Sequence, residues 1–212
     1  MKIIETKGIT YLEKLDFNDE WYWGSDFSCG DLYEAEEVYR SGGTFTPNRL
    51  IFVHFPDGKV VEPLLARQNQ YFGSPIFVDG VFYILLIDFE EKSIRIFNGS
   101  SDLTKLHIET EISLQEVKDC YNLGLKGSPL MLIREGADND FQIIWPEKVE
   151  FKISAKESFI YRMKNQLYFS EWHEDEQYRE EVNIREFTTG VLIEKIKGAY
   201  FTTKNNVSWI LR

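Results

Sequence analysis

Hydrophobic and polar positions alternate along this chain in short stretches that are separated by glycine, asparagine or charged residues. In the clearest stretch, the apolar runs 74–78 and 81–89 flank Asp79 and Gly80. An Asp-Gly pair accommodates the positive φ angles of a tight type I′ turn, so this stretch is predicted to form a β-hairpin. The runs 49–55 and 59–65, on either side of a Pro-Asp-Gly turn, predict a second hairpin.

The same alternation, in which every second residue is apolar, predicts about sixteen short strands over the whole chain. In residues 105–114 the apolar Leu106, Ile108 and Ile112 are predicted to lie on one face of a strand. The remaining predicted strands are 2–6, 9–15, 93–98, 129–135, 141–145, 148–153, 159–163, 167–172, 182–187, 191–196, 199–203 and 207–211.

Two segments carry a helical signal. Residues 31–39 begin with Asp31 and Glu34 at capping-box spacing, which favours a helix, but their tyrosines also alternate with charges as in a strand. Ser113 and Glu116 have the same capping-box spacing, so residues 113–121 are predicted to contain a single helical segment.

Strand-rich units recur at a nearly constant interval. Similar units start near Leu32, Ser74, Glu116, Ser158 and Ala199, which are 42, 42, 42 and 41 residues apart. Such a period is typical of propeller blades, and the chain resembles small five-bladed β-propellers in general architecture. We therefore predict an all-β fold, a small β-propeller closed by pairing of the N- and C-terminal strands.

A β-sandwich with one or two short helices is the alternative fold, because it would take both helical signals as true helices. The two Gly-Ser-Pro tripeptides, at Gly73 and Gly127, are 54 residues apart and do not fit the blade interval. No linker or low-complexity segment interrupts the chain, so residues 1–212 are predicted to form a single all-β domain.

The composition and charge limit the partners. The formal net charge of −11 repels phosphate backbones and anionic lipid surfaces, so neither nucleic acid nor a membrane is an expected partner. The chain has only two cysteines, Cys29 and Cys120, no apolar signal sequence near its start and no apolar run of membrane-spanning length. We expect a soluble cytoplasmic protein with two free thiols.

No motif in the sequence indicates catalysis. The three histidines, His54, His107 and His173, are isolated from one another, so neither a zinc site nor any other metal or cofactor is predicted. Cys29 has no histidine near it in sequence to act as a base. Residues 171–181 are strongly acidic and are predicted to be a solvated hairpin tip.

Residues 20–39 combine aromatic and acidic side chains more densely than the rest of the chain. Three aromatic residues in a row, at positions 21–23, cannot all face one core, and flat rings beside carboxylates can hold sugars or basic peptide side chains. The alternative is that these rings fill the core. The binding residues predicted on this basis are Trp21, Trp23, Asp26, Asp31 and Glu34.

These observations predict a non-catalytic binding protein of the propeller type, whose ligand is a protein or a small molecule. A glycan-active hydrolase is the first alternative, in which two acids, drawn from a set that includes Asp79 and Asp88, face each other in a cleft. The second alternative is an acidic immunity-type protein that masks a basic partner, which would bind less tightly as the salt concentration rises.

Overall fold

The structure is a computed structural model, and it describes residues 2–16, 18–26, 28–100, 103–174, 178–203 and 208–212. Over these residues the fold is all-β, with antiparallel sheets, one α-helix and one short 3₁₀ helix. The all-β prediction is therefore confirmed. The chain divides into two compact units, Met1–Cys120 and Tyr121–Arg212, which are described separately below.

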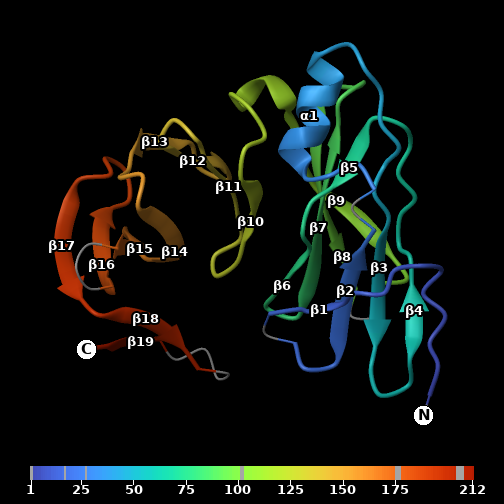
Figure 1. Cartoon of the computed structure of the whole chain (residues 1–212), viewed down its shortest axis with the longest axis horizontal. Coiled ribbons are helices and arrows are strands. Elements are labelled where there is room, and N and C mark those ends of the chain that lie inside the picture. Colours follow the sequence, from blue (N-terminus) through green and yellow to red (C-terminus); the bar gives the residue numbers. More distant parts are fainter. Residues whose placement is uncertain (1, 17, 27, 101–102, 175–177, 204–207) are drawn as a thin grey trace. The chain divides into compact units, whose positions relative to one another are not determined.

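The N-terminal unit contains two sheets of strands that follow one another in the chain (Figure 1). The first sheet has the order β1-β2-β3-β4, from strands β1 (Glu13–Lys14), β2 (Trp21–Ser25), β3 (Leu50–His54) and β4 (Lys59–Val61). The second has the order β5-β7-β8-β9, with β6 paired to β7, from strands β5 (Gln70–Phe72), β6 (Ile76–Val78), β7 (Val81–Asp88), β8 (Ser93–Gly99) and β9 (Leu106–Ser113).

One apolar cluster joins these two sheets. Phe52 of β3 and Phe82 of β7 are fully buried, and their rings meet edge to face with centroids 5.7 Å apart. Trp21 and Trp23 of β2 belong to the same cluster, and the Trp21 ring lies 5.5 Å from that of Phe82. Edge-to-face aromatic pairs add to the area that is buried, so this cluster is the main source of stability between the two sheets.

The helix α1 (Leu32–Arg40) resolves the ambiguity of residues 31–39. The Asp31 carboxylate accepts a hydrogen bond from the Glu34 amide at 2.8 Å, and the Glu34 carboxylate accepts one from the Asp31 amide at 2.9 Å. This reciprocal capping box satisfies two amides at the start of the helix. The helix lies beside β5 (Figure 1) and buries Ala35 completely. The segment from Ser113 forms only the short 3₁₀ helix η1 (Leu114–Glu116).

The C-terminal unit contains three more sheets of consecutive antiparallel strands (Figure 1). The first has β10 (Leu123–Lys126), β11 (Met131–Glu135), β12 (Asp140–Trp145) and β13 (Val149–Lys152). The second has β14 (Glu157–Met163), β15 (Gln166–Glu174), β16 (Tyr178–Glu186) and β17 (Leu192–Lys197). The third is the hairpin of β18 (Ala199–Thr202) and β19 (Ser208–Leu211).

Opposite faces of the β14–β17 sheet pack on its two neighbours. Phe159 and Phe169 on one face join Phe141 of β12 in a cluster of aromatic rings, with Phe141 and Phe169 centroids 5.0 Å apart. Val182 and Ile184 on the other face pack with side chains of the β18–β19 hairpin, including Tyr200 and Ile210. The alternation of side chains along a strand thus gives this sheet an apolar contact on each side.

The hairpin at Asp79-Gly80 is confirmed. Asp79 has a φ of 50° and Gly80 one of 84°, and β6 pairs with β7 directly across this turn, with Val78 opposite Val81. The strands predicted between residues 129 and 211 also form as predicted, each with its expected neighbour in the chain.

The prediction for strand β9 is wrong in one respect. The register between β8 and β9 shifts between Ile96 and Phe97, so Thr110 lies opposite Ile96 but Ile108 lies opposite Phe97. A β-bulge of this kind inserts one residue and moves the side chains beyond it to the other face of the sheet. Ile112 is buried opposite Ile94, whereas Ile108 is 55% exposed, so the three apolar residues do not share one face.

The blade interval agrees with the sheets only in part. Four sheets begin at Gln70, Leu123, Glu157 and Ala199, within seven residues of the predicted starts. The predicted start at Leu32 is wrong, because that residue opens a helix between β2 and β3.

The strand predicted at residues 2–6 does not form, and the other strands expected to close a ring pair within their own sheets. Of the predicted N-terminal strands, the structure shows only β1, which pairs with β2, while β18 pairs with β19. None of the sheets built from the described residues is closed, so closure by the terminal strands stays a prediction.

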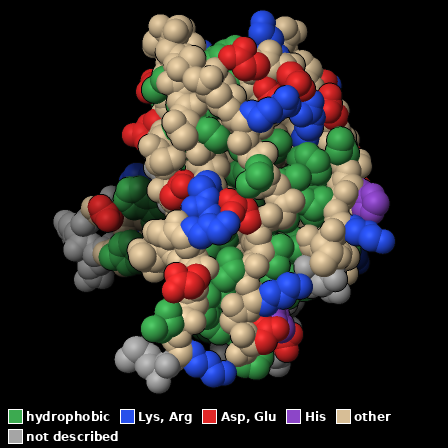
Figure 2. Space-filling model, turned by 90° about the vertical axis from the view of Figure 1, so that its right-hand side faces the viewer, with side chains coloured by type: hydrophobic (Ala, Val, Ile, Leu, Met, Phe, Trp, Pro, Cys, Tyr) green, Lys and Arg blue, Asp and Glu red, His purple; other side chains and the backbone are tan. Residues whose placement is uncertain are grey.

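Charges of both signs are mixed on the surface. Figure 2 shows one face of the molecule, on which acidic and basic side chains lie next to each other among hydrophobic ones. Ion pairs such as Arg49 with Glu62 at 2.9 Å and Arg95 with Glu111 at 2.7 Å are part of this pattern in the N-terminal unit. Among the described residues, no helix has the length and apolar composition that crossing a membrane requires.

Candidate functional site

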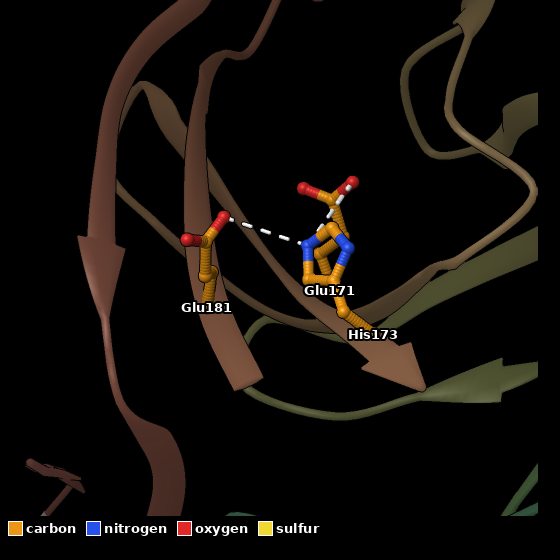
Figure 3. Close-up of side chains that lie close together, drawn as sticks. All are labelled: Glu171, His173 and Glu181. Atoms are coloured by element: carbon orange, nitrogen blue, oxygen red, sulfur yellow. Dashed lines mark ion pairs between the residues drawn. The ribbon is translucent and has the colours of Figure 1, made fainter. Parts of the chain in front are cut away.

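The strongest cluster of chemically active side chains lies on the hairpin of β15 and β16 in the C-terminal unit. Glu171 and His173 are two residues apart on β15, so both point to the same face of the sheet (Figure 3). The register places Glu181 of β16 directly opposite Glu171. Alternation along one strand and register between two strands therefore bring these three side chains together.

The three side chains form a compact group of possible ligands. The His173 Nε2 atom lies 3.5 Å from a Glu181 carboxylate oxygen and 3.8 Å from a Glu171 carboxylate oxygen. Dashed lines mark these two ion pairs in Figure 3. One ligand atom from each residue lies within 4.8 Å of the other two. The side chains are 10%, 14% and 12% exposed for Glu171, His173 and Glu181, so the group is largely removed from water.

Lys195 of β17 balances part of this negative charge. Its ammonium lies 2.5 Å from a Glu171 carboxylate oxygen and 3.3 Å from a Glu181 carboxylate oxygen. Burial raises the pKa of Glu171, but hydrogen bonds from Lys195 and Asn183 outweigh it and hold that pKa below its usual value. The same hydrogen bond to Glu171 raises the pKa of Lys195.

A second ion pair continues the network along the sheet. Asn183 donates from Nδ2 to Glu171 at 2.8 Å and to Glu157 at 2.7 Å. Arg185 donates to both carboxylate oxygens of Glu157, at 3.0 Å and 2.8 Å. Bidentate pairing of this kind fixes the geometry as well as the charge, so the Glu157 carboxylate and the Asn183 amide bonded to it are held rigidly beside the cluster.

Two polar atoms of the cluster lack hydrogen bonds. The His173 Nε2 and Asn183 Oδ1 atoms are buried and have no hydrogen-bond partner among the described residues. Over the same residues only one further buried side-chain atom, the Ser93 hydroxyl oxygen, shares this property. Since buried polar atoms are nearly always paired, two such atoms in one cluster require an explanation.

A pocket of about 670 Å³ opens beside this cluster, and Lys195 lines it. Four basic and two acidic side chains are among its lining residues, an excess of two positive charges in a chain whose net charge is −11. These six residues are Arg179, Lys195, Lys197, Arg212, Glu180 and Glu194.

Exposed apolar side chains gather in the same part of the chain. Of the fifteen large hydrophobic residues that are exposed in the described residues, eight follow residue 171. Phe201 and Trp209 face each other across the β18–β19 hairpin and are 48% and 56% exposed. Large exposed apolar patches mark interaction sites more often than plain surface.

The binding residues predicted from the sequence have structural roles in the N-terminal unit. Trp21 and Trp23 are each only 6% exposed and lie in the core. The Asp26 carboxylate accepts a hydrogen bond from the Arg49 amide at 2.9 Å, and Asp31 and Glu34 cap α1. The aromatic rings thus follow the alternative in which they fill the core, and ligand binding by these five residues stays a prediction.

The acidic segment 171–181 is predicted to be a solvated tip, of which residues 175–177 lie outside the described residues, and the prediction is wrong for the largely buried side chains of Glu171, His173 and Glu181. Glu171 is 7% exposed because the β15–β16 strands continue through it and turn its side chain inward. The signal in the sequence that could have indicated part of the site is the Glu-x-His spacing on a strand, which places Glu171 and His173 on one face. No local pattern indicates Lys195.

The chain was compared with protein families and with curated proteins. No family model matches it, and no curated protein matches it. The function is therefore argued from the geometry of the chain itself.

Proposed function

We propose that this chain is a non-catalytic binding protein that recognises an extended partner segment, with acidic and apolar side chains, along strand β17. The observation that carries the proposal is the open edge of the β14–β17 sheet. Strand β17 is the last in that sheet, and five of its six residues are exposed. An exposed edge strand presents unpaired amides and carbonyls to which another strand can add.

The side chains around this edge favour a partner of defined chemistry. Leu192 and Ile193 are 44% and 51% exposed on β17 itself. Lys197 follows on the same strand and lines the pocket with Arg179 and Arg212, whereas Lys195 is already paired with Glu171 and Glu181. A segment with alternating acidic and apolar residues would match both properties, with main-chain hydrogen bonds supplying affinity and side chains supplying specificity.

The proposal is tested with a short fluorescent peptide in which Glu and Val alternate, and with a counterpart in which Lys replaces Glu. We expect saturable binding of the acidic peptide, measured by fluorescence anisotropy, with weaker binding of the basic one and a loss of affinity as salt rises. N-methylation of alternate peptide amides should also weaken binding, because it removes main-chain donors. Equal binding of both peptides would contradict the proposal.

Two variants locate the binding surface. Ile193→Ser and Lys197→Glu should each weaken binding of the acidic peptide by about tenfold, which corresponds to about 1.4 kcal/mol. Ile108→Ser is the matched control, because Ile108 is also an exposed isoleucine on a strand but lies in the N-terminal unit. An unchanged affinity in Ile193→Ser would refute binding along β17.

We also propose that the five sheets are the blades of a small propeller, closed by the N-terminal and C-terminal strands. This is supported by the order of the strands, since each sheet consists of strands that follow one another in the chain, as the blades of a propeller do. Cysteines introduced singly at Ile3, Thr6 and Thr10, each together with Leu211→Cys, test closure by disulfide trapping. A bridge requires Cα atoms within about 7 Å, so none of these pairs should cross-link if the ends do not meet.

A carboxylate-based hydrolase is the second candidate, and one observation favours it. Glu171 and Glu181 present carboxylate oxygens within 4.8 Å of each other, slightly closer than the separation of about 5–5.5 Å between the acid pairs of retaining glycosidases. Lys195 bridges this pair, so hydrolysis would require the ammonium to move. A panel of nitrophenyl glycosides tests this function through the release of nitrophenol. Activity that is present in the wild type and abolished in both Glu171→Gln and Glu181→Gln would support hydrolysis over the binding proposal.

A further inference from the structure

We propose that Glu171, His173 and Glu181 bind a divalent transition-metal ion, Zn²⁺ or Mn²⁺, in competition with the Lys195 ammonium. This inference does not depend on the peptide-binding proposal. It starts from the donor set, which offers one imidazole nitrogen and two carboxylate oxygens from two adjacent strands (Figure 3). Imidazole with carboxylate is a ligand set that Zn²⁺ and Mn²⁺ use in proteins.

The spacing of the donor atoms fits a single ion. Bonds of about 2.0–2.2 Å place neighbouring ligand atoms around one ion about 3.0–3.6 Å apart. His173 Nε2 lies 3.5 Å from Glu181 and 3.8 Å from Glu171, close to that range before any ion draws the side chains together. The ligand oxygens of the two carboxylates lie within 4.8 Å of each other, and an ion would draw them closer. Because strands β15 and β16 hold the three residues in register, this requires side chains to move but not the backbone.

The two buried atoms without hydrogen bonds point to a ligand as well. The His173 Nε2 atom is buried between two carboxylates and makes no hydrogen bond to any described residue. Asn183 is only 2% exposed, and its Nδ2 is fixed on Glu171, while its Oδ1 has no partner in the described part of the chain. An ion would take the lone pair of His173.

Lys195 is the competitor for this position. Its ammonium already lies between the two carboxylates, where it supplies the positive charge that an ion would supply. The lysine side chain is 40% exposed and lines the adjoining pocket, so its flexible stem can swing outward. The metal affinity therefore depends on the free energy gained when the ion binds, minus the free energy needed to release the ammonium from Glu171 and Glu181.

The test uses the full chain, freed of metal with a chelator and titrated with ZnCl₂ by calorimetry and with MnCl₂ by electron paramagnetic resonance. We expect one saturable site in the wild-type protein. His173→Phe and Glu181→Gln should each lose affinity by more than about tenfold, and Lys195→Met should gain about tenfold or more. Glu174→Gln, which alters the exposed neighbour of His173 on the other face of β15, should bind like the wild type.

A second measurement separates loss of the site from loss of the fold. Imidazole ¹⁵N signals of the three histidines are followed during the Zn²⁺ titration, and only that of His173 should shift, while those of His54 and His107 stay in place. The gain of affinity in Lys195→Met cannot arise from misfolding. Absence of saturable binding, unchanged affinity in His173→Phe, or a shift at His54 in place of His173 would overturn the proposal.

Discussion

Single residues in this chain have roles that their chemistry alone does not reveal. Trp23 and Trp209 are both tryptophans on short strands, yet the first is 6% exposed and the second 56% exposed. Glu171 and Glu174 are both acidic residues of β15, but only Glu171 faces the charged cluster. The face of the strand on which a side chain lies decides which role it has.

The two tryptophans should therefore differ in their effect on stability. We expect Trp23→Ala to lower the free energy of unfolding by about 3–5 kcal/mol, because it removes a large ring from the cluster between two sheets. Trp209→Ala, the control, should change it by less than about 0.5 kcal/mol. Urea denaturation followed by circular dichroism measures both, and a Trp23→Ala protein as stable as the wild type would show that the ring is not in the core.

Glu186 provides a prediction for pH. Hydrogen bonds from the Thr189 hydroxyl at 2.7 Å and from the Thr189 amide at 2.6 Å lower the pKa of Glu186 to about 2. A carboxyl whose pKa is lower in the folded state stabilises the fold above its usual pKa of 4.5. This contribution should be lost as the pH falls from about 4.5 towards about 2.

Thr189→Val tests the cause of that shift. The variant keeps the amide but loses the hydroxyl, so the pKa of Glu186 should rise part of the way to its usual value. Carboxyl ¹³C chemical shifts, measured as a function of pH, give the pKa in both proteins. An identical pKa in Thr189→Val would assign the shift to the remaining donors, including Asn165.

At the scale of elements, local signals decide where each helix and strand begins. The capping box of α1 is formed by two side chains that are three residues apart, and it selects a helix where the pattern of residues 31–39 also allowed a strand. Strand β9 shows the limit of such signals. Its bulge depends on the register with β8 and is not apparent in the alternation of its own residues.

The cap of α1 should contribute measurably to stability. We expect Asp31→Ala to reduce the free energy of unfolding by about 1 kcal/mol, because the amide of Glu34 loses its hydrogen bond. Asp31→Asn keeps a hydrogen-bond acceptor at the same place and should reduce the free energy of unfolding much less. Chemical denaturation of the two variants checks this, and equal losses in both would indicate that the charge of Asp31, and not its capping bond, is what matters.

At the scale of the whole molecule, the chain was predicted to be a single domain, and the structure shows two compact units. If the units fold as one domain, unfolding should be a single cooperative transition. A protein that keeps only Trp21 and Trp23 as tryptophans gives a fluorescence signal from the N-terminal unit, while far-UV circular dichroism of the same protein reports the loss of strands in both units. If the single-domain prediction holds, the two unfolding transitions should have the same urea midpoint. Different midpoints would show two independently folding domains.

Most of the fold could be predicted because its signals are local. The hairpin at Asp79-Gly80, the hairpins between residues 159 and 211, and the cap of α1 all depend on residues that are near each other in sequence. The candidate site could not be predicted in this way. Lys195 is 24 residues from Glu171, and they meet only because β15, β16 and β17 pair in a definite register.

The sequence by itself determined that this chain forms β-strands and where most of them turn, because alternation and Gly-containing turns act over a few residues. Its capping-box spacing favoured a helix at residues 31–39 without excluding a strand. Only the tertiary structure decided which face of each strand is buried. It placed Trp21 and Trp23 of β2 in the core, and it brought Glu171, His173 and Glu181 of an acidic hairpin together with Lys195 of β17 in one largely buried cluster of charges. Burial and register depend on contacts between segments far apart in the chain, and these contacts set the chemistry of each side chain.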